Sequence, residues 1–423
     1  MTIDGVLSAA RADVRSALER ALSGHELSVE EALPLASVRG DDLAALAATA
    51  NVLREAQAGA IVTYVVNRNV NFTNACTKAC RFCAFARGQR SEEAYFLDDA
   101  EIFRRVVEAR DLGATEVCIQ AGLAPGMAPD LYERLVRGAR RVAPEIHLHA
   151  FSPEEIKYAS RLGDRSFRDT LIALRDAGLG SIPGTSAEIL DDGLRARLAP
   201  GRISTAEWID VVTTAHELGI PTTSTMMYGH LESAEHRVRH LALLRSIQQR
   251  TGGFTEFVPL SFVAEEAPLV RKGLFEGRTR GPDADEIVAV HALARVMLGE
   301  TFRNIQASWV KDGLPLATRL LDAGVNDLGG TLMNESISTA AGAGHGQLMT
   351  PKTLRAAIRS VGRVAAQRDT RYRLLRTFDG DADELAEPLD AIIDPEARFG
   401  SFRTMIHDDA IRLRVVRAGA GRS

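Results

Sequence analysis

Repeated alternation of short β-like runs with amphipathic helical stretches is the strongest constraint that this sequence places on its fold. The β-like runs lie near residues 69–75, 115–120, 146–151, 179–183, 221–228, 254–260, 303–308 and 325–328. Strands separated by helices pair in parallel, and eight strand–helix units favour a closed barrel over an open doubly wound sheet. We therefore predict an α/β protein with a TIM-type (β/α)8 barrel.

The length of 423 residues suits one barrel core with smaller appendages, since such barrels reach about 250 residues as one domain. We predict a helical N-terminal extension at 1–58, the barrel at 59–350, and a helical and irregular C-terminal extension at 351–423. Within the barrel, Pro282-Asp283 is expected to open a helix over 284–298. The acidic stretch 379–387 and the basic end 412–422 receive no role.

Charge and hydropathy narrow the class of protein. The 51 Lys and Arg against 56 Asp and Glu give a net charge of −5, with both signs spread along the chain. This pattern gives no sign of nucleic-acid binding. No apolar run approaches the ~18 residues of a membrane span, and the N-terminus lacks a basic region followed by an apolar stretch. We expect a cytoplasmic protein that does not contact a membrane.

Three cysteines, Cys76, Cys80 and Cys83, lie within eight residues, and the only other cysteine is Cys118. Spacings of three and two residues allow one loop to bind three irons of an iron–sulfur cube and leave the fourth iron open to a small molecule. A structural zinc site would need a fourth nearby ligand. A disulfide would leave an odd thiol in a chain with no other mark of secretion. We therefore interpret the three as cluster ligands.

Polar side chains fall on one face of several expected strands, because side chains alternate between faces with period two. In the second strand Val117 and Ile119 oppose Gln120, and a similar split recurs in the first, third and seventh strands. If the apolar rows pack under the helices, the polar rows form a pocket at the C-terminal mouth of the barrel. The candidates to line it are Gln120, His149, Glu256, Asn304 and Gln306. Asn67 and Glu116, near the strand starts, are expected to pair with other core groups.

The motif Cys-x-x-x-Cys-x-x-Cys after the first strand of such a barrel resembles the radical S-adenosylmethionine (radical SAM) superfamily. The resemblance implies that Cys76, Cys80 and Cys83 bind a [4Fe-4S] cluster. It also implies that the amino and carboxylate groups of S-adenosylmethionine chelate the fourth iron. Reductive cleavage of the sulfonium then gives methionine and a 5′-deoxyadenosyl radical.

Further residues match the superfamily's cofactor-binding positions. Phe82 corresponds to the aromatic residue near the adenine, although packing in the loop is an equally simple role. Gln120-Ala121-Gly122 resembles the Gly-Gly-Glu type of segment whose backbone receives the methionine amino group. Ala121 departs from the glycine that is common there.

Two later segments also resemble superfamily motifs. The fifth-strand motif is degenerate here and places Gly229 among the cofactor-binding candidates. The segment 180–188 matches the same pattern better but follows the fourth strand, so we give position more weight. Glu188 and Ser152 are candidates for the ribose and carboxylate of the nucleoside, with helix capping as the alternative for either.

Longer segments narrow the resemblance to the subunit 2 (CofH) type of the deazaflavin-forming FO synthases, over about residues 45–372. They are Asn71-Phe-Thr-Asn74, His147-Leu-His149-Ala-Phe-Ser-Pro-Glu-Glu155, Gly184-Thr-Ser-Ala-Glu188, Thr225-Met-Met-Tyr-Gly-His230, Thr251-Gly-Gly-Phe-Thr-Glu256-Phe-Val-Pro-Leu260, Asn304-Ile-Gln306-Ala-Ser-Trp309 and Asn326-Asp327-Leu-Gly-Gly330-Thr-Leu-Met. The resemblance implies hydrogen abstraction from the amino group of L-tyrosine, cleavage of Cα–Cβ, and addition of the 4-hydroxybenzyl fragment to C5 of 5-amino-6-(D-ribitylamino)uracil. The expected by-product is 2-iminoacetate. A flavodoxin or ferredoxin would supply electrons, and FO synthase subunit 1 is the expected functional partner.

This resemblance suggests roles for the polar candidates. Asn71, Asn304 and Gln306 are assigned to the substrates, with the latter two reading the uracil edge and the ribityl hydroxyls. Glu256 could pair with the tyrosine ammonium. His149 or Asp327 is a candidate to carry a proton during coupling. Cys118 is interpreted as a small filler of the barrel.

Two alternatives remain at this point. A sister enzyme of futalosine-route menaquinone synthesis (the aminofutalosine synthase type) shares the cysteine loop and much of the barrel. Glu256-Phe-Val-Pro-Leu260 and Ala267-Pro268 favour the deazaflavin enzyme. An iron–sulfur sensor or electron carrier without turnover would need neither a polar barrel mouth nor an open iron, and a fourth protein ligand to the cluster would support it.

Overall fold

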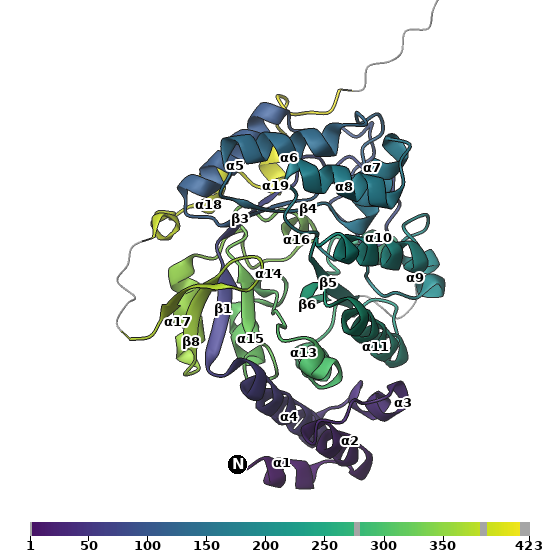
Figure 1. Cartoon of the computed structure of the whole chain (residues 1–423), viewed down its shortest axis with the longest axis vertical. Coiled ribbons are helices and arrows are strands. Elements are labelled where there is room, and N and C mark those ends of the chain that lie inside the picture. The colour runs from purple at the N-terminus through teal and green to yellow at the C-terminus, as the bar shows by residue number, and fades with distance from the viewer. Residues whose placement is uncertain (1, 275–279, 381–386, 415–423) are drawn as a thin grey trace, which may run out of the picture.

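The computed structural model describes residues 2–274, 280–380 and 387–414. Most of the acidic stretch and of the basic C-terminal end lies outside these ranges. The chain begins with four helices, α1 (Ile3–Ala9), α2 (Ala12–Leu22), α3 (Val29–Ala32) and α4 (Gly40–Ala58), which lie together below the strands in Figure 1. The predicted helical N-terminal region is therefore present, and α4 packs against α13 (Ala284–Leu298).

Within the described ranges, nine strands follow in three sheets. They are β1 (Ile61–Val65), β2 (Asn67–Val70), β3 (Glu116–Ile119), β4 (His147–Ala150), β5 (Thr222–Tyr228), β6 (Phe254–Ser261), β7 (Asp327–Gly330), β8 (Val364–Arg368) and β9 (Leu374–Phe378). The strand orders are β7-β1-β8-β9, β2-β3-β4 and β5-β6. All of these pairs are parallel except the β8–β9 hairpin.

Isolated parallel bridges join the three sheets. Ser181 pairs with His149 of β4, and the next residue, Ile182, pairs with Thr222 of β5. Ile305 and Gln306 likewise connect β6 to β7, through Phe257 and Asp327. Met333 pairs with Arg68 of β2 just beyond the end of β7. The predicted strands near 179–183 and 303–308 are thus present only as short bridges. With these bridges, the pairings continue from β2 through β3, β4, β5, β6 and β7, and β7 pairs with β1, which directly precedes β2 in the chain.

The helices pack their apolar sides against the strands. Those after the first strand are α5 (Asp99–Asp111), α6 (Leu131–Val142), α7 (Pro153–Leu162), α8 (Phe167–Ala177), α9 (Asp192–Leu198), α10 (Thr205–Glu217), α11 (Ala234–Thr251), α12 (Pro268–Arg271), α13, α14 (Trp309–Asp312), α15 (Leu314–Leu320), α16 (Ile337–Ala340), α17 (Pro351–Ser360), α18 (Pro395–Phe399) and α19 (Phe402–Ile406). In α6, Leu135 and Ala139 are buried while Arg134 and Arg137 face solvent, as helical periodicity requires. The α/β class is therefore confirmed.

Two sequence expectations need correction. The first strand was predicted over 69–75, but extended structure begins at Ile61 and β2 ends at Val70. The C-terminal extension was predicted as helical and irregular, yet it contains β8 and β9, and β8 pairs with β1 from Val364 to Gln367 (Figure 1). Ala and Gln in Val-Ala-Ala-Gln-Arg are weak strand formers, so pairing with β1 rather than local preference makes this segment a strand.

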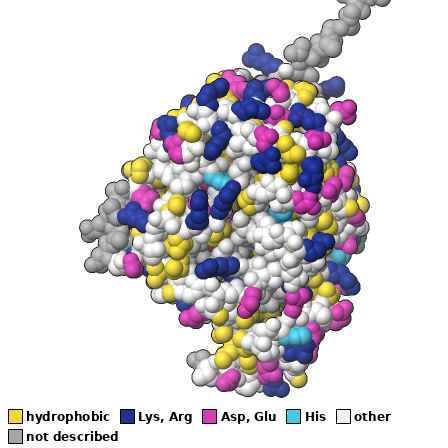
Figure 2. All heavy atoms as spheres, viewed as in Figure 1, with side chains coloured by type: hydrophobic (Ala, Val, Ile, Leu, Met, Phe, Trp, Pro, Cys, Tyr) yellow, Lys and Arg dark blue, Asp and Glu magenta, His cyan; other side chains and the backbone are white. Residues whose placement is uncertain are grey.

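On the face in Figure 2, basic and acidic side chains are mixed. Among the described helices, none is both long enough and apolar enough to cross a membrane.

Candidate active site

A cavity of about 430 Å³ opens where the cysteine loop meets the C-terminal ends of the strands. Most of the residues selected from the sequence line it. They are Cys76, Phe82, Cys80, Cys83, Gln120, Ala121, Gly122, His149, Ser152, Glu188, Glu256 and Gln306. Residues near the strand starts, such as Glu116 and Glu256, lie deep in the cavity, because parallel strands direct their C-terminal ends to the mouth.

Backbone hydrogen bonds hold the cysteine loop against the end of β3. Thr77 N–H donates to the Leu123 carbonyl (3.0 Å), and Gly122 N–H donates to Thr73 (2.8 Å). Only glycine allows this approach, because a Cβ at position 122 would lie 2.3 Å from the carbonyl oxygen of Ala75. The residue before Cys76 is therefore fixed directly against β3.

Gly122→Ala is expected to destabilise the protein by about 1–3 kcal/mol, because the added methyl group must displace backbone at Ala75. Since the displaced segment leads into Cys76, iron retention after anaerobic reconstitution should fall as well. The urea midpoint and iron content measure both effects. Gly344→Ala is the matched control, because a Cβ there meets nothing within 4 Å. Wild-type iron content and midpoint in Gly122→Ala would contradict the close approach.

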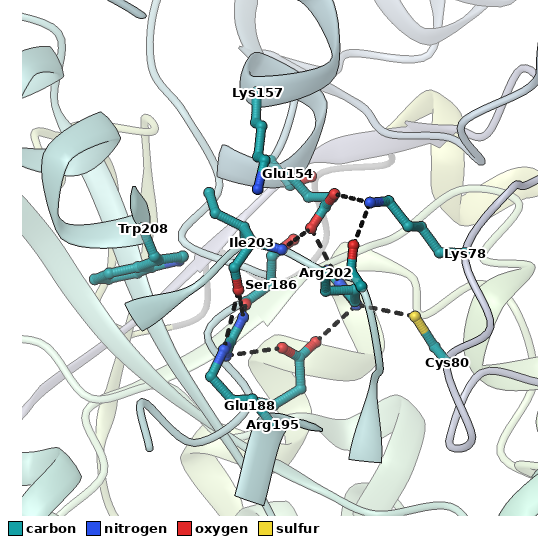
Figure 3. Close-up of polar contacts among 12 residues, drawn as sticks. Lys78, Cys80, Glu154, Lys157, Ser186, Glu188, Arg195, Arg202, Ile203 and Trp208 are labelled. Carbon is teal, nitrogen blue, oxygen red and sulfur yellow. Dashed lines mark hydrogen bonds and ion pairs between the residues drawn. The ribbon is translucent and has the colours of Figure 1, made fainter. Parts of the chain in front are cut away.

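A network of charges lies behind the loop, as Figure 3 shows. Arg202 lies 3.6 Å from the Cys80 sulfur and 3.1 Å from Glu188 Oε1. It also lies 3.5 Å from a Glu154 oxygen, while the other Glu154 oxygen pairs with Lys78 at 3.1 Å. These contacts join the loop to α7, through Glu154, and to the segments before and after α9, through Glu188 and Arg202. No motif or periodic pattern surrounds Arg202, so nothing in the sequence singles it out.

The donor set fits an iron–sulfur cube. The three thiols come from one loop and line one cavity, and burial raises the pKa of Cys80 to about 12 and also raises the pKa of Cys83. A coordinated metal keeps such thiols deprotonated. Across the described ranges, no group of three or more His, Cys, Asp or Glu side chains is arranged around a single-ion site. Cube ligands bind different irons, so they do not need to converge on one point.

Ser152 and Glu155 form a capping box at the start of α7. Ser152 Oγ accepts from Glu155 N–H (3.3 Å), and Glu155 Oε2 accepts from Ser152 N–H (2.7 Å). Its other carboxylate oxygen accepts from Ala121 N–H at 3.0 Å. Burial raises the pKa of Glu155 to about 7 against the effect of these hydrogen bonds. Capping by Ser152 is confirmed, and Glu155 joins the cavity lining as a residue that the sequence analysis did not select.

Glu188 has no capping role. It has a positive φ of 41°, and α9 is capped by Asp191 instead. Its carboxylate faces the cavity between Arg195 (3.6 Å) and Arg202 (3.1 Å).

Four selected residues do not line the cavity, because their polar groups are used elsewhere. The Asn71 amide donates to the Gln120 carbonyl (2.9 Å), and the Asn304 amide donates to the Thr255 carbonyl (3.0 Å). Gly229 forms the turn after β5 at φ +88°, where its N–H donates to Glu232. The Asp327 carboxylate accepts from the backbone N–H of Gly329 (2.7 Å) and from the Arg368 side chain of β8.

Arg368 of β8 was not among the residues selected from the sequence. It donates to both carboxylate oxygens of Asp327 (2.6 and 3.1 Å) and lies 3.5 Å from Glu256. Tyr372, in the turn after β8, donates its hydroxyl hydrogen bond to Glu256. Arg368 lines the deep end of the cavity beside Glu256. The C-terminal segment therefore contributes to the site.

His149 lies in the wall above this group. Its Nδ1 is 2.7 Å from Ser181 Oγ. Burial lowers the pKa of His149 to about 4, and the nearby Glu116 carboxylate only partly opposes this. The imidazole is therefore neutral at physiological pH.

Glu256 gives the site a measurable pH dependence. Burial, with Asp327 nearby, raises its pKa from 4.5 to about 7, although Arg368 and Tyr372 oppose the shift. Between these values the folded protein keeps a proton that the unfolded chain releases, so the contribution of Glu256 to stability falls as pH rises and is constant above about pH 7. Glu256→Gln cannot lose this proton. The Tm of Glu256→Gln minus the Tm of the wild type should therefore increase by a few degrees between about pH 5 and about pH 8.

Differential scanning fluorimetry at the two pH values measures this difference. The exposed Glu300 offers the control Glu300→Gln, whose Tm difference from the wild type should not change with pH. An equally flat difference for Glu256→Gln would mean that the Glu256 carboxyl is ionised throughout.

Comparisons with known proteins agree with this geometry. The radical SAM superfamily model matches residues 70–244, and the CofH/MqnC C-terminal region matches residues 251–379. The 5-amino-6-(D-ribitylamino)uracil–L-tyrosine 4-hydroxyphenyl transferase of Methanothermobacter thermautotrophicus is 48% identical over 347 residues, which are 82% of this chain and 94% of that protein. The enzyme of the same name from Nostoc punctiforme is 46% identical over 373 residues, which are 85% of this chain and 97% of that protein.

The FO synthase of Mycobacterium tuberculosis is 50% identical over 364 residues, which are 86% of this chain but only 42% of that longer protein. Among solved structures, methylornithine synthase (PylB) aligns with a TM-score of 0.64 at 18% identity, over 82% of this chain and 96% of that one. The hydrogenase maturase HydG from Carboxydothermus hydrogenoformans aligns with a TM-score of 0.66 at 15% identity, over 88% and 83%. At such identities these structures support the fold alone. The near-complete match to the transferases, by contrast, shows the family: the chain belongs to the 5-amino-6-(D-ribitylamino)uracil–L-tyrosine 4-hydroxyphenyl transferases of the radical SAM superfamily.

Proposed function

We propose that this chain transfers the 4-hydroxybenzyl group of L-tyrosine to C5 of 5-amino-6-(D-ribitylamino)uracil, releasing 2-iminoacetate, methionine and 5′-deoxyadenosine. The observation that carries the proposal is that the three loop cysteines line the same cavity as the polar residues selected from the strands. The 48% identity to a transferase that this chain spans almost completely supports the same reaction. A sensor or electron carrier would have no use for this cavity.

The cysteine loop is the proposed site of a [4Fe-4S] cluster, held by Cys76, Cys80 and Cys83. When bound with S-adenosylmethionine, the cluster supplies the electron that starts radical chemistry. Lys78, Glu188 and Arg202 line this end of the cavity, so the amino and carboxylate groups of a ligand would meet charges of both signs there. Phe82, whose ring lies 5.7 Å from the Arg202 guanidinium carbon, offers an apolar surface to the adenine.

We also infer that the strands close into a (β/α)8 barrel. The bridges at Ser181, Ile182, Ile305 and Gln306 occupy the two positions where the sequence predicts the fourth and seventh strands. With them the parallel pairings run through eight positions and return to the first. Similarity to PylB and HydG supports this arrangement.

The two substrates divide the cavity by depth. Hydrogen abstraction occurs beside the cysteine loop, so the tyrosine amino group belongs near the mouth and not beside the deep Glu256. Lys311 and Glu335 line the cavity, where burial lowers the pKa of Lys311 and the Glu335 carboxylate opposes the shift. The same carboxylate accepts from the backbone N–H groups of Ile337 (3.0 Å) and Ser338 (2.9 Å). Such a cation and anion suit the carboxylate and ammonium of an amino acid. We therefore move the ammonium-binding role from Glu256 to Glu335. His149, neutral and facing the cavity, remains the candidate to accept a proton during coupling.

The test incubates reconstituted, reduced protein with S-adenosylmethionine, tyrosine and the ribityl-substituted diaminouracil. We expect 5′-deoxyadenosine and the coupled product by mass spectrometry, with both dependent on tyrosine. Reactions without the diaminouracil are the control for coupling. Deoxyadenosine formation that does not depend on tyrosine would refute the substrate assignment. The electron donor is proposed to be a flavodoxin or ferredoxin, and FO synthase subunit 1 is proposed to use the product.

A further inference from the structure

The C-terminal hairpin forms the floor of the cavity. Arg368 and Thr370, from β8 and the turn that follows it, line the cavity together with Glu116 of β3 and Glu256 of β6. We call these four residues the floor. Two of them come from a segment that the sequence places outside the barrel, so the floor is assembled only when β8 pairs with β1.

The turn that carries the floor residues has a specific construction. The Asp369 carboxylate accepts from the backbone N–H groups of Arg371 and Arg373, both at 2.9 Å, and from Arg373 Nε at 2.6 Å. Tyr372 adopts a left-handed conformation at φ 61°, which is uncommon for a bulky residue. This conformation lets its hydroxyl reach Glu256 while its ring lies under the Arg368 guanidinium, 3.9 Å from the centroid. Strained residues held in this way often serve binding sites.

Polar groups of the floor remain available to a ligand. Glu116 accepts a hydrogen bond from the Asn67 amide (2.9 Å) on Oε1, and His149, Asn67 and Arg368 keep its pKa below the usual range despite burial. The Thr370 hydroxyl is buried and lies close enough to the Glu116 carboxylate to help lower its pKa, yet the contact falls short of full hydrogen-bond geometry. A buried hydroxyl with so poor a partner gains from a ligand or water that completes its hydrogen bonding.

We propose that the floor binds the ribityl chain of the diaminouracil, with Thr370 and Glu116 as specificity-determining residues. This inference rests on the proposed function. The ring carbon that receives the benzyl group must lie near tyrosine, and tyrosine must lie near the cysteine loop. The ribityl chain is the part of the acceptor that can extend away from the loop, toward the strand starts.

The chemistry of the floor suits a neutral polyol. Each hydroxyl of such a chain both donates and accepts, so it can donate to the Glu116 carboxylate and accept from Thr370. Arg368 is already paired with Asp327, so the floor lacks a free cation for a carboxylate or phosphate. The Gln306 amide, which also lines the cavity, adds a further group that can both donate and accept.

The test combines a change in the protein with a change in the ligand. Kd is measured by titration calorimetry for 5-amino-6-(D-ribitylamino)uracil and for 5,6-diaminouracil, which lacks the chain, on reconstituted protein with S-adenosylmethionine and tyrosine. For Thr370→Val and Glu116→Gln we expect the Kd of the ribityl compound to rise about tenfold. The Kd of the truncated compound should be the same as in the wild type. Thr370→Ser, which keeps the hydroxyl, should restore binding of the ribityl compound.

Thr377→Val is the control on the same hairpin, since Thr377 is exposed on β9. An equal loss for both ligands, or no loss for the ribityl compound, would overturn the ribityl assignment. If the wild type forms coupled product while the floor variants bind normally, only the floor proposal fails. If the wild type neither binds nor converts the ribityl compound, the proposed function fails with it.

Discussion

Cys80→Ala is expected to yield a protein without a stable iron–sulfur cluster and with no detectable 5′-deoxyadenosine formation. With only Cys76 and Cys83 remaining, one iron of the cube loses its sole protein ligand. Arg202, 3.6 Å from the Cys80 sulfur, would then face an alanine and cannot replace the lost thiolate, because guanidinium does not bind iron. Iron and sulfide content, the visible spectrum and deoxyadenosine measured by mass spectrometry test this expectation together.

Cys118→Ala is the matched control, because Cys118 is the only other cysteine and lies on β3, outside the loop. Burial raises the pKa of its thiol well above the usual range, so the thiol stays protonated although it lines the cavity. We expect wild-type iron content in this variant. Wild-type iron in Cys80→Ala, or cluster loss in Cys118→Ala, would contradict the ligand assignment.

Features with a local physical cause were predictable from the sequence. The cysteine spacing defines a loop whatever the rest of the chain does, and the three thiols indeed line one cavity. The helix over 284–298 is confirmed as α13, because Asp283 caps it through the Glu286 N–H. Both depend on residues only a few positions apart.

Features that depend on distant pairing were not predictable. Arg368 is buried beside Asp327 and Glu256. These two partners lie 41 and 112 positions earlier in the chain, so no local pattern can reveal them. A five-residue strand that ends in arginine normally indicates an exposed edge. Nothing local to β8 indicates that its arginine faces inward.

Side-chain alternation correctly predicts which face of a strand a residue occupies, but it does not predict whether the side chain is free to bind a ligand. Gln306 and Asn304 share a face, as period two requires, and Gln306 lines the cavity. Asn304 instead donates to Thr255 and accepts from Asn326. The alternation gives only the direction of a side chain. Whether that side chain can bind a ligand depends on the hydrogen-bond partners that the neighbouring strands supply.

Arg368→Met is expected to destabilise the protein by about 3–5 kcal/mol, because it leaves the Asp327 carboxylate buried without its counter-charge. The Asp327 side chain is fully buried and the Arg368 side chain is only 3% exposed, so solvent cannot replace the lost pairing. The hydrogen bonds from Thr63 and Gly329 to Asp327 would remain, but they are too few for a buried charge. In a protein of this size the Tm should fall on the order of 5–10 °C.

Two further variants distinguish loss of this pair from general damage. Arg368→Met combined with Asp327→Asn removes both charges, keeps the amide as a partner for Thr63, and should recover most of the lost Tm. Arg239→Met breaks an exposed pair with Glu235, in which both side chains are more than half exposed, and should change stability by less than about 0.5 kcal/mol. If Arg368→Met were as mild as Arg239→Met, the buried pair would not hold the hairpin against β1. A double variant no more stable than Arg368→Met would instead show that the arginine acts by packing, through its contact with the Tyr372 ring.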